Sequence, residues 1–78
     1  MRMKNEEFEV KTYGKSELAM LYFPMMGSAK SALSNLNYWI HQNQSLSAAL
    51  KDCGMSPKAK FYTPKEVALI AHFLGEPL

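Results

Sequence analysis

Chemically reactive side chains are few in this sequence, and none belongs to a familiar catalytic arrangement. The two histidines, His41 and His72, lie far apart in the chain, and the one cysteine, Cys53, has no local partner that would activate it. The metal-binding spacings C-x2-C and H-E-x-x-H do not occur, and the four glycines are single rather than clustered in a phosphate-binding loop. We therefore expect no enzymatic activity, no catalytic residue, no metal site, no cofactor and no small-molecule substrate.

Polar side chains that could bind a nucleic acid gather in residues 29–42 and in the basic loop that follows residue 54. Serine, asparagine, tyrosine, histidine and lysine side chains can donate hydrogen bonds to base edges and phosphates, and all of them except lysine can also accept hydrogen bonds from base edges. In residues 29–42 these side chains recur at spacings that place them on one face of an expected helix. The candidate DNA-binding residues are Lys30, Ser31, Ser34, Asn35, Tyr38, His41, Lys58 and Lys60.

Charge supports duplex DNA as a partner only mildly. Nine Lys and Arg residues against seven Asp and Glu give a net charge of +2, which is a weak footprint for a nucleic-acid-binding protein. The excess is concentrated in residues 28–65, which contain five lysines and one aspartate. The candidate face has no arginine, although arginine makes the commonest specific base contact. A solvated helix face that binds nothing explains the short polar side chains at least as well, but an aromatic residue such as Tyr38 is unexpected at its centre.

Four helices are expected to position these groups. Leucine, alanine and methionine dominate the apolar residues, with only two valines and two isoleucines, and this composition favours helices over sheets. Ser28 is a suitable N-cap, and Thr63, Pro64 and Glu66 form the pattern of a capping box. The first two helices resemble a helix-turn-helix unit, whose second helix lies in the major groove of DNA, although the turn here is longer than usual. The expected helices cover residues 17–23, 29–42, 45–53 and 64–74.

An extended arm is expected before the first helix. Residues 8–13 alternate in polarity as a short strand does, with Phe8, Val10 and Thr12 on one side. This pattern predicts an arm that pairs with residues 60–62. The predicted fold class is therefore mainly α, a small four-helix domain with helix-turn-helix-like first two helices and a short N-terminal extended arm.

The chain of 78 residues is too short for two hydrophobic cores. We expect residues 1–7 to form a flexible N-terminus and residues 8–78 to form a single helical domain. Basic side chains near the N-terminus are not followed by an apolar run, and no stretch approaches the roughly 20 apolar residues that span a bilayer. A cytoplasmic protein with no membrane partner is expected.

The apolar stripes of the helices predict a hydrophobic core, and the chain has apolar side chains beyond those that this core requires. Our lead hypothesis is a non-enzymatic helix-turn-helix-like DNA-binding or regulatory protein. Leu69 and Phe73, on a second apolar face of the last helix, together with Met20, Met25 and Met26, favour an alternative: a protein-protein interaction or oligomerisation module whose partner is another protein or a second copy. A last helix that is packed on two sides explains that face equally well. The expected core residues are Leu18, Leu21, Leu33, Leu36, Trp39, Ile40, Leu46, Leu50, Val67, Ile70 and Leu74.

The order and spacing of several short motifs resemble one bacterial protein family. The motifs include Glu17-Leu18-Ala19, Tyr22-Phe23-Pro24, Trp39-Ile40, Phe61-Tyr62-Thr63-Pro64 and Leu74-Gly75-Glu76-Pro77. This family is catalogued as domain of unknown function 4248, and the likeness covers nearly the whole chain. The resemblance implies a small bacterial protein and carries over no catalytic or binding residue.

Overall fold

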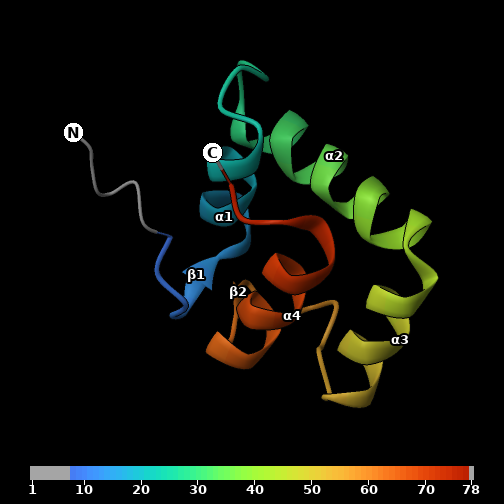
Figure 1. Ribbon diagram of the computed structural model, residues 1–78. Helices are drawn as coiled ribbons and strands as arrows, with labels where there is room; N and C mark the ends of the chain where they lie inside the picture. The colour runs from blue at the N-terminus through green and yellow to red at the C-terminus, as the bar shows by residue number, and fades with distance from the viewer. Residues whose placement is uncertain (1–7, 78) are drawn as a thin grey trace.

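The computed structural model describes residues 8–77, which form four helices and one pair of two-residue strands (Figure 1). This confirms the mainly α fold class and the expected helices, whose boundaries differ from the prediction by at most two residues. The expected flexible N-terminus, residues 1–7, lies outside the described part of the chain. The elements in chain order are β1 (Tyr13–Gly14), α1 (Lys15–Tyr22), α2 (Ala29–Gln42), α3 (Gln44–Asp52), β2 (Phe61–Tyr62) and α4 (Pro64–Leu74).

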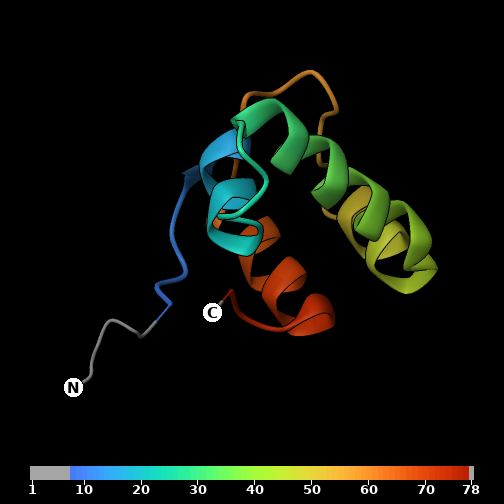
Figure 2. The ribbon, with the colours of Figure 1, turned by 90° about the horizontal axis from the view of Figure 1, so that it is seen from above.

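Helix α2 is the longest element, and the other helices are arranged around it. Helix α1 packs against α2, whereas α3 contacts both α2 and α4. Figures 1 and 2 both show α1 near the N-terminal half of α2, and Figure 1 shows α3 below the C-terminal end of α2. The loop of residues 53–60 returns from α3 to β2, and Figure 2 shows it passing beside α2. One side of α2 is thus covered while its outer side is free.

The two short strands join the beginning of the described chain to its last third. Tyr13 pairs with Tyr62 and Gly14 with Phe61 in an antiparallel register, and the Lys15 N–H donates to the Lys60 carbonyl at 3.0 Å. The predicted pairing with residues 60–62 is therefore confirmed at the end of the arm, where Tyr13 is the one residue of 8–13 that is strand.

The arm does not keep the two sides that a strand alternation would give it. Tyr13, which the alternation places opposite Phe8 and Val10, is buried, whereas Val10 is 49% exposed. The Tyr13 ring stacks on Phe8 at a centroid distance of 5.5 Å, and its hydroxyl donates to the Glu9 carbonyl at 2.8 Å. Residues 8–12 have no strand partner in the structure, so the alternation of a strand does not apply to them.

Local hydrogen bonds at the helix ends explain why the boundaries were predictable. At the start of α2 the Ser31 N–H donates to the Ser28 hydroxyl at 3.1 Å. At the start of α4 the Thr63 N–H donates to the Glu66 carboxylate at 2.8 Å and the Glu66 N–H donates to the Thr63 hydroxyl at 3.3 Å. Such caps satisfy backbone donors that have no partner inside the helix. Gly75, with φ +85°, then ends α4 in a conformation that disfavours other residues.

A single asparagine separates α2 from α3. The Asn43 N–H bonds the carbonyls of Trp39 and Ile40, which ends α2. Its side-chain oxygen accepts from the Leu46 N–H at 2.9 Å, which starts α3. The Ser47 hydroxyl also donates to the Ile40 carbonyl at 2.7 Å, so the sharp turn between the two helices is held from both sides.

The core is formed by side chains from all four helices and both strands. Seven of the expected core residues are buried, namely Leu18, Leu36, Ile40, Leu46, Leu50, Val67 and Ile70. The prediction was wrong for Leu21 and Trp39, which are 40% and 43% exposed, and Leu33 and Leu74 are only half-buried. The buried hydrophobic residues that the prediction omitted are Tyr13, Ala19, Ala32 and Tyr62, and Glu66 is buried as well.

Helix packing explains these differences. The buried stripe of α2 consists of Ala32, Leu36 and Ile40, which are four residues apart, so Trp39 lies at the edge of the stripe. The Trp39 ring meets Phe23 edge to face at 5.1 Å between centroids. Ala19 and Ala32 are both fully buried, and their small side chains let α1 and α2 approach closely.

Stability measurements can separate the observed core from the one predicted by the apolar stripes. Leu36→Ala should lower the free energy of unfolding by about 2–5 kcal/mol, because it opens a cavity at a fully buried position. The matched control Leu21→Ala should lower it by less than about 1 kcal/mol, since that side chain is 40% exposed. Urea denaturation measures both values, and equal losses would contradict this assignment of the core.

Alkaline pH should destabilise the fold through its buried tyrosines. Burial, and to a smaller extent the charge of Glu66, raises the pKa of Tyr62 from 10.0 to about 12. The folded state therefore retains a proton that the unfolded state loses above pH 10, so the free energy of unfolding is constant below that pH and falls as the pH rises toward 12. Tyr22 should act in the same direction, because burial and Glu76 raise its pKa to about 12.

Urea denaturation at a series of pH values measures this loss. In Tyr62→Phe the loss should be smaller than in the wild type, because the ionising hydroxyl at this position is removed. An equal loss in both proteins would show that Tyr62 does not contribute.

Candidate functional site

Five of the candidate DNA-binding residues meet on the outer face of α2. One shallow hollow of about 410 Å³ is lined by Lys30, Ser31, Ser34, Asn35 and Tyr38, and Met26 of the preceding turn borders it. Four of the five side chains are exposed, and Asn35 is half-buried. We call this surface the outer face of α2. The structure thus brings these five polar groups together, as the helical spacing predicted.

The chemistry of the outer face follows from how α2 is anchored. Its opposite side carries the buried stripe, so the polar side chains are turned to solvent. The helix contains no aspartate or glutamate, so no carboxylate of α2 repels an approaching phosphate. The Ser31 side chain is partly engaged already, because the Ser28 hydroxyl donates to it at 3.1 Å. Lys30, Ser34 and Tyr38 are the groups most available to a ligand on this face.

The other candidate residues lie elsewhere. His41 and Lys60 line a deeper cleft of about 610 Å³ on one flank of α2, which also receives Lys15 and Lys51. Lys58 is exposed in the loop of residues 53–60, where its N–H donates to the Ser56 hydroxyl at 3.3 Å. The eight predicted residues therefore divide between the outer face, this cleft and the loop.

Two lysines that line the cleft, Lys15 and Lys51, are not among the residues predicted from the sequence. Lys15 is the first residue of α1, and Lys51 lies in the last turn of α3. Nothing in their local sequence links them, because the α2–α3 turn and the β1–β2 pairing bring them together. The Lys15 ammonium donates to the Ser56 carbonyl at 3.1 Å and lies 5.3 Å from the centroid of the Tyr62 ring.

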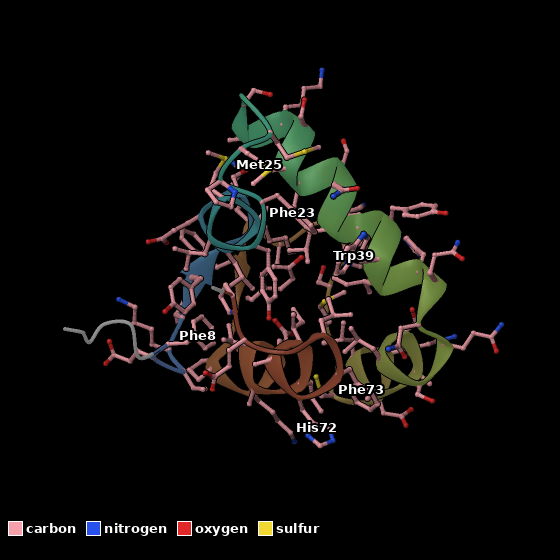
Figure 3. The ribbon with its side chains drawn as sticks, turned by 45° about the horizontal axis from the view of Figure 1, so that its top comes forward. Phe8, Phe23, Met25, Trp39, His72 and Phe73 are labelled. Atoms are coloured by element: carbon pink, nitrogen blue, oxygen red, sulfur yellow. The ribbon has the colours of Figure 1, made fainter. Side chains whose placement is uncertain are left out.

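The predicted interface on the last helix is not a free apolar face. Leu69 and Phe73 are half-buried and pack against the core. In Figure 3 Phe73 lies on the part of α4 that adjoins α3, whereas the exposed His72 points away from the protein. The larger exposed apolar side chains lie on other elements: Val10, Leu21, Met25, Met26, Tyr38, Trp39 and Phe61.

Other chemistry is sparse in the described part of the chain. Cys53 is half-buried, and its thiol donates to the Leu50 carbonyl at 3.3 Å. Among residues 8–77, no group of three or more histidine, cysteine, aspartate or glutamate side chains could hold a metal ion. In the same residues, no helix is both long enough and apolar enough to cross a membrane.

Comparison with known proteins identifies a family. No curated protein and no solved structure matches the chain. One family model does match, over residues 9–77, which include every helix and both strands. The chain therefore belongs to the family described as Domain of unknown function (DUF4248).

Proposed function

We propose that this protein is a non-enzymatic helix-turn-helix-like DNA-binding or regulatory protein that reads duplex DNA with the outer face of α2. The observation that carries the proposal is the hollow on this face, where five polar side chains meet on a helix without carboxylates. A DNA-binding role is consistent with a bacterial cytoplasmic protein.

The dimensions of α2 suit the major groove. Its 14 residues extend over about 21 Å at a rise of roughly 1.5 Å per residue, and a major groove about 12 Å wide admits one helix. Helix α1 packs against α2 as the first helix of a helix-turn-helix unit packs against the second. The turn of residues 23–28 is longer than usual, but it leaves the outer face of α2 open.

The side chains divide into positioning and reading groups. Lys30, in the first turn of α2, and the loop residues Lys58 and Lys60 can neutralise phosphates, which fixes the register of a protein on DNA. Ser34 and Asn35 can donate to and accept from base edges. Tyr38 adds a hydroxyl and an exposed ring, with 59% of its surface accessible.

Binding to mixed duplex DNA at several salt concentrations tests the proposal. Three lysine–phosphate contacts should give a slope of log K against log salt of about −3. Fluorescence anisotropy of a labelled duplex measures this slope. Absence of binding at low salt, or binding that does not weaken as salt is added, would contradict the proposal.

Substitution on the outer face locates the interaction. Ser34→Glu places a negative charge at the centre of the hollow and should weaken DNA binding by about tenfold or more, because a carboxylate repels phosphates. Ala68→Glu adds the same charge at an exposed position of α4 and serves as the matched control. An equal loss of affinity in both variants would show that only net charge matters and that α2 does not read DNA.

A protein-interaction or oligomerisation module is the second candidate function. Because Leu69 and Phe73 pack against the core, this candidate rests on Met25 and the exposed apolar side chains of the α1–α2 side. Met25 is 88% exposed in the turn between the helices, and Trp39 is 43% exposed on α2. Figure 3 shows Met25, Phe23 and Trp39 along this same side of the molecule. Exposed methionine and aromatic side chains are adaptable contacts for a protein partner.

Light scattering over a range of protein concentrations tests self-association. If copies associate through this side, Met25→Glu should return the mass to that of a monomer, because association would bury the new charge. Val10→Glu, on the exposed arm, should leave the association unchanged. A monomeric wild-type protein at all concentrations would contradict self-association.

A further inference from the structure

The cleft on the flank of α2 is a second polar surface, separate from the outer face. It lies between α2, the end of α3, the loop of residues 53–60 and the start of α1, and its volume is about 610 Å³. Cavities of roughly 300–1,000 Å³ are the usual size of small-molecule sites. It is deeper than the hollow on the outer face, and three lysines line it rather than one.

The rim of the cleft is basic. Lys15, Lys51 and Lys60 come from three different segments, His41 adds an imidazole, and no aspartate or glutamate lines the cleft. A cleft lined by charges of one sign concentrates the opposite charge, particularly where its walls are apolar. Three ammonium groups around one opening therefore favour an anion.

The base of the cleft is apolar. Leu33, Ile40, Leu50, Met55 and Tyr62 all contribute to its lining. Leu50 and Tyr62 are each only 1% exposed, so the apolar surface that is open to the cleft comes mainly from the half-buried Leu33 and Met55. An inorganic ion would leave this apolar surface in water, whereas a ligand with an apolar end would cover it.

One of the ammonium groups is already held in place. Lys15 Nζ donates to the Ser56 carbonyl at 3.1 Å and lies over the Tyr62 ring. Neither of these partners removes its positive charge. A side chain that is fixed before binding loses less conformational entropy when a ligand arrives.

We infer that this cleft binds a small organic anion with an apolar end, whose charged group lies among Lys15, Lys51 and Lys60 and whose apolar end covers the base of the cleft. The inference does not depend on DNA binding, because it concerns a different kind of ligand and shares only Lys60 with the residues that the proposed function uses. A carboxylate and a phosphate monoester share this chemistry, and both are tested.

Four probes with the same eight-carbon chain test the charge requirement: octanoate, octyl phosphate, octanol and octylamine. NMR chemical-shift mapping of the full chain should show saturable binding of octanoate, octyl phosphate or both, with shifts around the cleft. Octanol should bind at least about tenfold more weakly, and octylamine should not bind. Equal binding of octylamine, failure of both anions, or shifts confined to another surface would overturn the inference.

Substitutions of lysines at the rim test whether the cleft, rather than another surface, binds the anionic probes. Lys51→Gln and Lys60→Gln together should weaken binding of the anionic probes by about tenfold or more, because both lysines are exposed and can be changed without disturbing the core. Lys11→Gln and Lys65→Gln together remove the same two charges from exposed positions that do not line the cleft and are the matched control. Equal effects from the two sites would overturn the inference.

A second variant tests the cleft without changing its charge. Asn37 is exposed at the edge of the cleft, and Asn37→Trp should fill the opening and abolish binding of the anionic probes. Ser34→Glu, on the outer face, should leave that binding within about twofold. Loss of DNA binding with intact anion binding, or the reverse, would distinguish failure of one proposal from failure of the other. Unchanged anion binding in Asn37→Trp would contradict the placement of the ligand.

Discussion

Burial of one stripe of α2 is the constraint on which the rest of the structure depends. Ala32, Leu36 and Ile40 are buried on one side of the helix, and this sets the direction in which every other α2 side chain points. A domain of 78 residues has little core to spare, so α1 and α3 must both use this stripe. The polar side of α2 is left to solvent as a direct result, and the candidate functional surfaces lie there and on its flank.

Closure of the chain by β1 and β2 is the second determinant. The strands are only two residues long, yet they bring Lys15 beside Lys60 and hold Tyr13 and Tyr62 against the core. The contact of the Lys15 ammonium with Ser56 then ties the loop of residues 53–60 to the start of α1. The basic cleft therefore depends on the β1–β2 pairing, because its lysines come from segments that are distant in the sequence and that this pairing helps to bring together.

The two candidate surfaces share α2 but differ in chemistry. The outer face is shallow, polar and free of carboxylates, which suits a large polyanion with many weak contacts. The cleft is deeper, with an apolar base below its lysines, which suits a small molecule that can be enclosed.

Local signals in the chain were sufficient to predict the four helices, the caps at Ser28 and Thr63, and the grouping of Lys30, Ser34 and Tyr38 on one face. Caps and faces depend on hydrogen bonds and spacings within a few residues, which can be read directly from the order of side chains. Burial and the meeting of distant groups were set by the packing of the whole chain. Apolar periodicity alone placed Leu21 and Trp39 in the core and left open whether Leu69 and Phe73 lie at a free surface or inside the protein, because it identifies a face but not what covers it. The convergence of Lys15, Lys51 and Lys60 had no local signal, since it requires the α2–α3 turn, the strand pair and the returning loop at the same time.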